Sequence, residues 1–173
     1  GAVMAADPIT GACGIGHTRW ATHGGVTEAN AHPIMTADGA IAVVHNGIIE
    51  NHHTLKKELM ANGHVFSSDT DTEVLCHLFA EELPRHDALI DATSAVLARI
   101  EGAYAFAVLT RAFPGQVAVA RNASPLAIGL GEGANYIGSD AMAMGGLTRR
   151  IIFLKDGDFG VLTADHADIR DGD

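Results

Sequence analysis

Short apolar runs separated by Gly, Pro, Asn or Asp predict β-strands in two groups along the chain. The first group consists of residues 14–20 and 40–45. The second group lies in the last third at hairpin spacing, which favours antiparallel pairing, and its predicted strands are residues 104–110, 116–121, 126–130, 136–139, 151–154 and 159–162. The polar segment 21–38 is long for a plain connection, and loops of that kind are often functional.

Apolar residues at helical spacing predict three helices between the two strand groups. The predicted helices cover residues 51–62, 71–83 and 88–100. Gly63 and Pro84 are stop signals after the first two, and we expect Thr70 or Asp71 to cap the start of the second. A block of helices between groups of antiparallel strands predicts an α+β fold, with the helices laid on the sheets.

The composition limits the class of protein. The chain has 173 residues, and its 11 basic and 21 acidic side chains give a net charge of 11 − 21 = −10. Apolar residues make up 47%, which is enough for the core of one domain. We expect no nucleic acid as a partner, because no cluster of basic residues is available to neutralise phosphates. We also expect no membrane insertion, because no apolar stretch approaches the ~20 residues of a spanning helix.

The two cysteines and the first residues bear on compartment and domain limits. Cys13 and Cys76 are too few for a disulfide framework, and such a count suits a reducing, cytoplasmic setting. Residues 1–10 lack a basic segment followed by a long apolar one, so they are not a secretory signal. We interpret them as a loop or a cloning remnant, which leaves residues 11–173 for the folded part.

The first segment that could carry chemistry is His-Thr-Arg-Trp-Ala-Thr-His-Gly at 17–24. On a strand, His17 and Arg19 share one face. The planar guanidinium of Arg19 is suited to binding a carboxylate through two hydrogen bonds. An ordinary surface ion pair at the end of a strand explains the same residue equally well.

The second segment is His-Asn-Gly-Ile-Ile-Glu-Asn at 45–51, which follows an apolar strand. Asn-Gly is a strong signal for a tight turn, so a simple hairpin at Asn46 and Gly47 is slightly favoured. The alternative is an oxyanion hole, in which the Asn46 amide and the Gly47 backbone N–H donate to one developing negative charge.

The third segment, residues 67–73, is acidic and polar at the start of a predicted helix. Helix capping is its ordinary explanation, and a carboxylate that holds a substrate ammonium group is the alternative. Ten histidines also raise the question of a metal. Only His17, His23, His32 and His45 form a plausible ligand set, no zinc-binding spacing is present, and we expect neither a metal nor a cofactor.

These segments, in this order, resemble the glutaminase domains of the glucosamine-6-phosphate synthase family. The resemblance runs from about residue 11 to the end of the chain. It rests on the segments at 17–24 and 45–51 together with Asn-Ala-His-Pro at 30–33, Thr-Asp-Thr-Glu-Val at 70–74, Glu-Gly-Ala-Tyr at 101–104, Ala-Arg-Asn-Ala-Ser-Pro-Leu at 120–126 and Ile-Gly-Ser-Asp at 137–140.

The resemblance implies an N-terminal-nucleophile hydrolase fold. This is a four-layer αββα sandwich of two antiparallel sheets with helices outside. It also implies release of ammonia from L-glutamine, which in the family passes to a separate sugar-isomerase domain that makes glucosamine 6-phosphate from fructose 6-phosphate. That isomerase domain is absent from the 173 residues.

Substrate-binding roles follow from the resemblance position by position. Arg19 resembles the residue that binds the glutamine α-carboxylate, and Thr22 and His23 line the same pocket. Trp20 resembles a residue at the pocket edge that is associated with ammonia transfer. Asp71 resembles the acceptor for the α-ammonium group.

The resemblance also implies that Asn46 and Gly47 form the oxyanion hole, and that Gly47 contacts the substrate as well. One cationic fork and one carboxylate recognise the two charges of an amino acid, while paired donors stabilise the tetrahedral oxyanion.

The sequence departs from the family at the nucleophile. The family uses a cysteine at the mature N-terminus, whose α-amine is the base, whereas this chain starts with Gly1 and only 16 residues precede His17. We expect the first strands and a helix of the sandwich to be missing. Cys13 is rejected as a substitute, because it is predicted to lie on the strand of His17 and has no free amine.

The chain alone is therefore predicted to be an inactive, partial glutaminase domain. The alternatives are a non-catalytic fragment that binds glutamine or another chain, with self-association through open sheet edges, and a histidine-dependent metallohydrolase.

Overall fold

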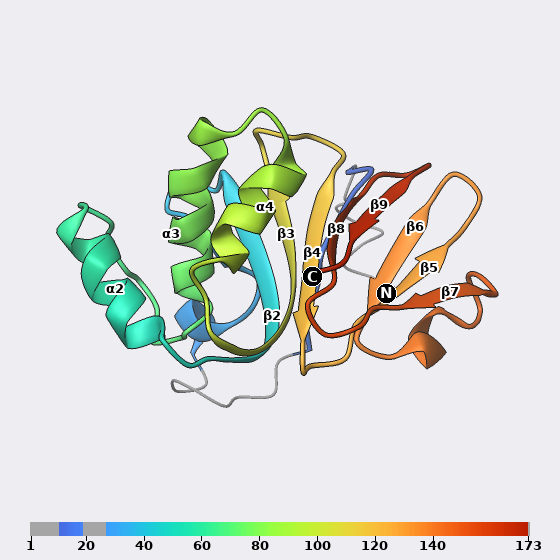
Figure 1. Ribbon diagram of the computed structural model, residues 1–173, viewed down its shortest axis with the longest axis horizontal. Coiled ribbons are helices and arrows are strands. Elements are labelled where there is room, and N and C mark those ends of the chain that lie inside the picture. The colour runs from blue at the N-terminus through green and yellow to red at the C-terminus, as the bar shows by residue number, and fades with distance from the viewer. Residues whose placement is uncertain (1–10, 19–26, 173) are drawn as a thin grey trace.

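A computed structural model describes residues 11–18 and 27–172, and these form two antiparallel sheets with helices on one side (Figure 1). The larger sheet, sheet A, has the strand order β1-β2-β3-β4-β8-β9. Its strands are β1 (Ile34–Met35), β2 (Ile41–Ile49), β3 (Gly102–Thr110), β4 (Val117–Asn122), β8 (Phe159–Leu162) and β9 (Ala167–Arg170). Sheet B has the order β6-β5-β7, and its strands are β5 (Ala127–Leu130), β6 (Asn135–Gly138) and β7 (Arg150–Phe153).

The three predicted helices are present, each slightly shorter than expected. They are α2 (His52–Ala61), α3 (Glu73–Glu82) and α4 (Leu89–Leu97). Short 3-10 turns complete the described secondary structure: η1 (Glu28–Asn30), η2 (Leu83–Arg85) and η3 (Ala141–Met144). Within residues 11–18 and 27–172, none of the helices has the length and apolar character to cross a membrane.

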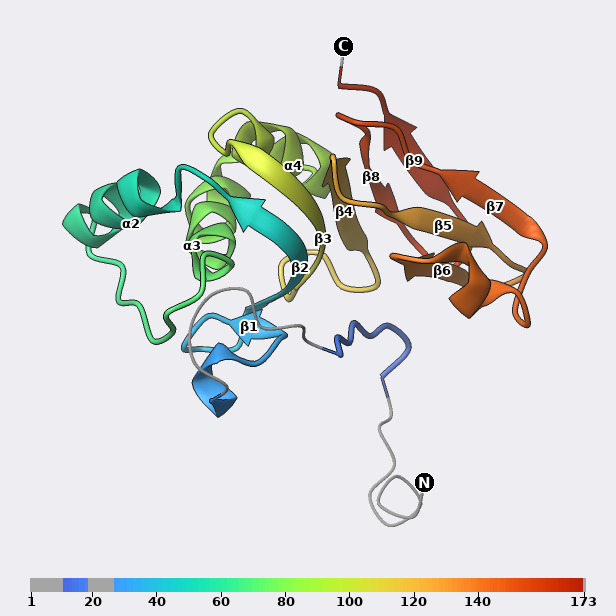
Figure 2. The ribbon, with the colours of Figure 1, turned by 90° about the horizontal axis from the view of Figure 1, so that it is seen from below.

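The alternating faces of sheet A explain the layers. On β3, the side chains of Tyr104, Phe106 and Val108 belong to the core beneath the helices, where Phe79 of α3 meets Phe106 edge to face. The intervening Ala105 and Ala107 belong to a second core shared with sheet B. Because successive strand residues point to opposite faces, one strand contributes to both cores. Figure 2 shows the resulting order of helices, sheet A and sheet B.

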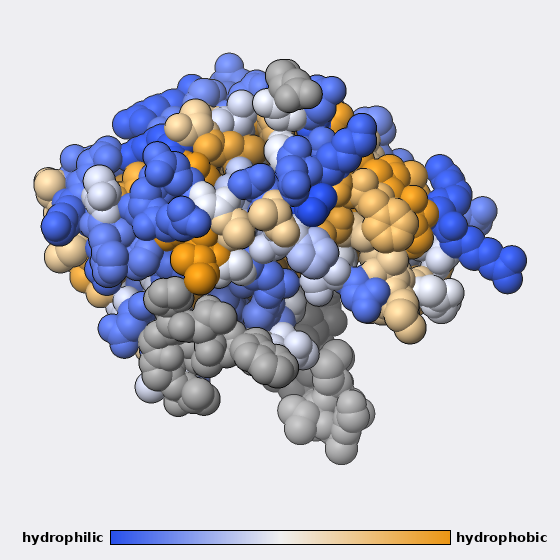
Figure 3. Space-filling model, turned by 60° about the horizontal axis from the view of Figure 1, so that its bottom comes forward, coloured by the Kyte–Doolittle hydropathy of each residue, from blue (hydrophilic) through white to orange (hydrophobic). Residues whose placement is uncertain are grey.

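These layers confirm the predicted α+β class and the pair of antiparallel sheets. Beyond sheet B the described residues place only the 3-10 turn η3, so three of the four expected layers are present in the described part of the chain. Hydrophobic residues gather on the surface of the sheet B half, at the right in Figure 3. Met142, Leu147 and Phe153 are exposed there.

Two predicted features of the first half are wrong. Residues 14–18 of the predicted first strand are not a strand, and its last two residues lie outside the described ranges. The Asn-Gly turn is also absent, because β2 continues through Gly47 to Ile49 and pairs with β3 as far as Gly102. The long partner strand outweighs the local turn preference, which acts only over a few residues.

Two strands were missed by the hydrophobic pattern. β1 has only two residues, and β9 reads Ala-Asp-Ile-Arg, with too little apolar character to be recognised. Both are edge strands of sheet A, held by pairing with β2 and β8 respectively. The interpretation of residues 1–10 as a loop or remnant lies outside the described residues.

Candidate functional site

Asn46 and Gly47 lie in the second half of β2, where the strand is irregular. Gly47 has φ +117°, a conformation that side chains other than glycine rarely adopt. A Cβ atom at this position would overlap the carbonyl oxygen of Ala103 on β3 and would lie 2.9 Å from Oγ of Ser124. Glycine is therefore required here by both conformation and space.

The segment at 120–126 supports Gly47 from the other side. Arg121 donates from Nε to the carbonyl oxygen of Ser124 at 2.7 Å, and its guanidinium also pairs with Asp156 at 3.1 Å. Asn122 donates to the carbonyl oxygen of Gly102 at 2.7 Å. These bonds hold Ser124 against the strand, which gives this motif a structural role that the sequence alone did not indicate.

The carboxamide of Asn46 is oriented by His17. Nε2 of His17 lies 2.7 Å from Oδ1 of Asn46, across 29 residues of chain. A carbonyl oxygen can only accept, so the imidazole N–H donates. The carboxamide oxygen is then occupied, and the Nδ2 group, the donor that an oxyanion hole requires, points along the other branch of the amide.

Asp71 lies beneath the same stretch of β2 and does not cap a helix. Its Oδ2 accepts a hydrogen bond from the backbone N–H of Ile49 at 2.8 Å, and its side chain is 5% exposed. Helix α3 begins at Glu73, and the cap position, Thr72, makes no capping bond through its side chain. The predicted cap at Thr70 or Asp71 is therefore wrong, because the Asp71 carboxylate is used to attach the loop to β2.

Thr72 joins two histidines on the helix side of β2. Its hydroxyl lies 2.9 Å from Nε2 of His32 and 3.0 Å from Nδ1 of His45. His45 Nδ1 is also 3.9 Å from Oδ2 of Asp71. We refer to His17, His32, His45, Asn46, Asp71 and Thr72 as the site cluster.

His45 is the most deeply buried histidine of the site cluster. Burial lowers its pKa to about 4, with a further lowering by His17, and the nearby Asp71 carboxylate opposes the change. The imidazole is therefore neutral at neutral pH. A neutral Nδ1–H directed at Thr72, on the side of Asp71, fits the 3.0 Å distance to the hydroxyl, and the imidazole adds no buried charge of its own.

Three of the four histidines considered as possible metal ligands make other contacts. His17 contacts Asn46, and His32 and His45 contact Thr72, whereas His23 lies outside the described residues. The described residues contain no group of three or more His, Cys, Asp or Glu side chains placed to hold a metal ion.

Four of the predicted substrate-binding residues fall between residues 18 and 27, which the structure does not describe. Arg19, Trp20, Thr22 and His23 lie outside the described residues, and their roles stay predictions. The structure thus brings together Asn46, Gly47 and Asp71 from the predicted set.

The two cysteines do not resemble activated nucleophiles. Cys76 is buried in α3, and its Sγ lies 3.4 Å from the carbonyl oxygen of Ile34. Burial raises the pKa of Cys76 well above its ordinary value, and partial burial also raises the pKa of Cys13. Catalytic thiols have lowered pKa values. The chemistry supports the rejection of Cys13, although the strand on which that rejection relied is not formed.

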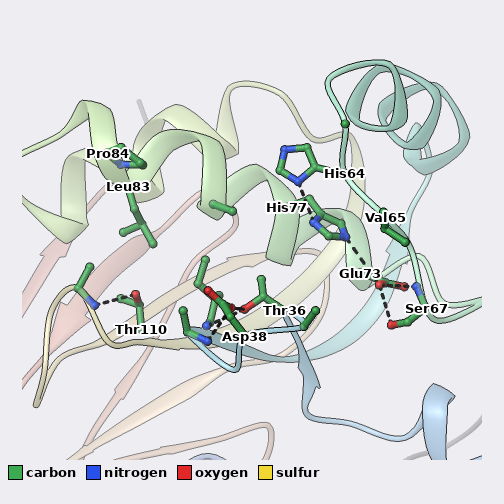
Figure 4. A pocket seen from close by; sticks show the side chains of 16 residues that line it. Thr36, Asp38, His64, Val65, Ser67, Glu73, His77, Leu83, Pro84 and Thr110 are labelled. Carbon is green, nitrogen blue, oxygen red and sulfur yellow. Dashed lines mark hydrogen bonds and ion pairs between the residues drawn. The ribbon is translucent and has the colours of Figure 1, made fainter.

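A second cluster, which the sequence did not reveal, borders a cavity of about 560 Å³ (Figure 4). Nδ1 of His64 lies 3.1 Å from Nδ1 of His77, and Nε2 of His64 lies 3.4 Å from Glu81. Nε2 of His77 is 3.7 Å from Glu73. We refer to His64, Glu73 and His77, which line the cavity, together with Glu81, which contacts His64, as the pocket cluster. The signal in the sequence is the i,i+4 spacing of Glu73, His77 and Glu81 on one helix.

Glu73 holds the loop before α3 rather than the helix itself. Oε1 of Glu73 accepts from the backbone N–H of Ser67 at 2.8 Å, and Oε2 accepts from that of Ser68 at 2.6 Å. These bonds lower the pKa of Glu73 although burial opposes them. The cavity is lined by neither Asn46, Gly47 nor Asp71, so it is distinct from the site cluster.

Comparison with known proteins places these observations in a family. Residues 17–145 match the family described as "Glutamine amidotransferase domain". The chain is 49% identical to glutamine–fructose-6-phosphate aminotransferase (isomerizing) of Zymomonas mobilis, over 99% of this chain and 28% of that protein. It is 52% identical to the protein of the same name from Thermus thermophilus, over 95% of this chain and 27% of the relative.

A solved structure agrees with these relatives. Glutamine phosphoribosylpyrophosphate amidotransferase from B. subtilis superimposes with a TM-score of 0.75 at 27% identity, over 91% of this chain and 34% of that one. The chain thus spans about a quarter of the length of the curated relatives that it matches. The metallohydrolase alternative finds no support in these matches. From its sequence, its two-sheet fold and its family match, the chain belongs to the glutamine amidotransferase family.

Proposed function

We propose that this chain forms the glutamine-binding part of a glutaminase site that releases ammonia from L-glutamine. The observation that carries the proposal is the pairing of an oriented Asn46 carboxamide with Gly47, which lies beside it in a glycine-only conformation. Two fixed donors at one place stabilise the negative charge that develops on the amide oxygen during hydrolysis.

The remaining recognition is electrostatic. The Asp71 carboxylate accepts the α-ammonium group of glutamine, and the Arg19 guanidinium binds its α-carboxylate. Thr22 and His23 line the pocket, and Trp20 lies at its edge. Opposite charges on the protein match the two charges of a free amino acid, so a peptide-bound glutamine, which lacks these charges, is excluded.

We further propose that the parent enzyme is cytoplasmic and passes the ammonia to a sugar-isomerase domain, which uses fructose 6-phosphate. The support is the name shared by the curated relatives, glutamine–fructose-6-phosphate aminotransferase (isomerizing). The nucleophile in this proposal is a cysteine outside these 173 residues, as the family resemblance implies, and the raised pKa values of Cys13 and Cys76 support it.

Calorimetric titration of the 173-residue chain with L-glutamine tests the binding proposal. We expect saturable heat for the wild-type chain and at least a tenfold loss of affinity in Asp71→Asn. Asp38→Asn is the matched control, since it also removes one negative charge and preserves an oxygen for Thr36 and Ala40. Absence of glutamine binding in the wild-type chain, or equal binding in both variants, contradicts the proposal.

The catalytic part of the proposal has a separate test. We expect the 173-residue chain to produce no ammonia from glutamine. Ammonia production that is lost in Cys13→Ala contradicts the assignment of the nucleophile to another part of the enzyme.

An interaction fragment is the second candidate. It is favoured by the exposed side chains of Met142, Leu147 and Phe153 and by the described edge strands β6 and β7 of sheet B. Analytical ultracentrifugation decides this point. Self-association that increases with concentration and is lost in Phe153→Ser supports it, whereas a monomer at every concentration excludes self-association.

A further inference from the structure

The two ring nitrogens of His17 lie in different surroundings. Its Nε2 lies 2.7 Å from Oδ1 of Asn46. Its Nδ1 is buried and has no hydrogen-bond partner among the described residues. An unpaired buried acceptor is unfavourable, so the ring is held in an orientation that satisfies Asn46 at the expense of its own second nitrogen.

The bond to Asn46 determines the tautomer of His17. The carboxamide oxygen can only accept, so Nε2 carries the proton and Nδ1 does not in the neutral ring. The same bond fixes the orientation of the Asn46 carboxamide, because Oδ1 faces His17 and Nδ2 therefore lies on the opposite branch. If the carboxamide were flipped, Nδ2 would face the Nε2–H donor of His17, and Oδ1 would face the oxygen of the substrate.

We propose that His17 is a positioning residue, whose Nε2–H fixes the Asn46 carboxamide so that Nδ2 donates to the amide carbonyl oxygen of glutamine. The inference rests on the proposed function only for the identity of the acceptor. The role of His17 toward Asn46 follows from the contact between the two side chains. His17 acts through Asn46 and does not itself contact the substrate.

Packing alone is the competing explanation, since the ring of His17 meets that of His32 edge to face at 4.6 Å between centroids. Two substitutions separate packing from donation. His17→Phe preserves an aromatic ring and removes the donor. His17→Gln removes the ring and places an amide N–H near the position of Nε2, so it restores the donor to Asn46.

The first measurement uses the wild-type 173-residue chain and needs no ligand. Long-range ¹H–¹⁵N spectra report which imidazole nitrogen of His17 carries the proton. We expect the Nε2–H form at neutral pH, together with slow exchange of the Asn46 side-chain amide protons. The Nδ1–H form as the major tautomer overturns the proposal, whether or not the chain binds glutamine.

The second measurement is the affinity for L-glutamine and the ¹⁵N shift of the Asn46 side-chain amide on saturation. We expect His17→Phe to weaken binding at least fivefold and to abolish the shift, and His17→Gln to restore both to within twofold of wild type. A folded His17→Phe variant with wild-type affinity overturns the proposal, as does a His17→Gln variant as weak as His17→Phe.

The Asp71→Asn variant distinguishes failure of this inference from failure of the proposed function. It is expected to lose glutamine binding while the His17 tautomer and Asn46 amide exchange stay as in wild type. If the wild-type chain binds no glutamine, the proposed function fails, and the tautomer measurement still decides the role of His17. If His17→Phe does not fold, the tautomer and the His17→Gln affinity decide it.

Discussion

The site cluster and the pocket cluster both contain closely spaced histidines, yet most of their contacts differ in kind. In the site cluster, His17 hydrogen-bonds an amide, and His32 and His45 hydrogen-bond a hydroxyl, while His45 also lies 3.9 Å from the Asp71 carboxylate. In the pocket cluster, both histidines face carboxylates, with Glu81 beside His64 and Glu73 beside His77. Asp71 and Thr72 of the site cluster directly precede α3, and Glu73, His77 and Glu81 of the pocket cluster lie on it.

This difference indicates two roles: contacts in the site cluster orient side chains, and contacts in the pocket cluster anchor a loop. Neutral partners fix the tautomer and direction of an imidazole without adding charge, which suits a site whose own ligand is charged. Carboxylate partners instead anchor a loop, and Glu73 does so through the backbone of Ser67 and Ser68. The comparison predicts that changes in the site cluster affect glutamine binding as well as stability, and that changes in the pocket cluster affect stability alone.

The largest expected effect is on Gly47, next to the site cluster, and Gly63, next to the pocket cluster, is its counterpart. Gly47→Ala should lower the free energy of unfolding by about 4 kcal/mol, because the new methyl overlaps Ala103 in a positive-φ conformation. Gly63→Ala, beside His64, has φ +94° but no neighbouring atom within 4 Å, and should cost about 1 kcal/mol. Urea unfolding measures both. Equal costs would show that the β2–β3 approach is not the constraint.

The next effect is the pH dependence contributed by His45. Its pKa is lowered from 6.5 to about 4, so the unfolded chain binds more protons between these values. The protonation of His45 therefore leaves the free energy of unfolding unchanged above pH 6.5 and lowers it by about 3 kcal/mol as the pH drops to 4. Unfolding free energies against pH check this contribution.

Replacing His45 or His77 by asparagine shows which of the two clusters causes that pH dependence. His45→Asn places a nitrogen near the position of Nδ1 and does not titrate, so it should remove most of the histidine contribution. The pKa of His77 is also lowered, by burial and by His64, and His77→Asn should remove a smaller part. A larger effect from His77 would reverse the ranking of the two clusters.

A smaller effect is expected from the buried acids. Glu73→Gln should cost about 2 kcal/mol, because an amide NH₂ then faces a backbone N–H of Ser67 or Ser68. Glutamine affinity should stay unchanged. Asp71→Asn should cost less stability, since an amide oxygen still accepts from Ile49, while affinity is lost. Unfolding and calorimetry on the same samples measure both quantities, and the opposite pattern would refute the division of roles.

The smallest effect is expected at the outer edge of the pocket cluster. Lys56 lies 4.7 Å from the ring centroid of Phe66, which in turn packs on His77. Lys56→Met retains the aliphatic stem and removes the cation, and should lower the free energy of unfolding by about 0.5 kcal/mol. A salt titration of both proteins provides the control, because the difference should shrink as salt is added.

Local patterns in the sequence predicted most of the fold. The helical pattern located the three predicted helices, and the strand pattern predicted β8 with the bounds that the structure has. The pattern failed where a non-local partner decided the outcome. Asn46 and Gly47 favour a turn on their own, but nine residues of pairing with β3 keep them in a strand.

The site was predicted in part for a similar reason. Motif resemblance identified Asn46, Gly47 and Asp71, because those residues lie in short recognisable segments. The contacts of Thr72 with His32 and His45 span 40 and 27 residues, and the contact of His64 with His77 spans 13. No spacing rule predicts such encounters, because they depend on how segments distant in the sequence are placed against α3 and the loop before it.

The bond from Ile49 to Asp71 has a consequence for redesign and for natural variation. The Asp71 carboxylate, which is proposed to recognise an amino group, also holds β2, the strand that carries Asn46 and Gly47, through its hydrogen bond with Ile49. A substrate without an ammonium group can therefore be selected at little cost in stability only through a residue that keeps an oxygen for Ile49, such as asparagine. Any other residue at this position requires an earlier, otherwise silent replacement that secures Ile49 by other means, so the order in which mutations arise decides which new substrates are reachable.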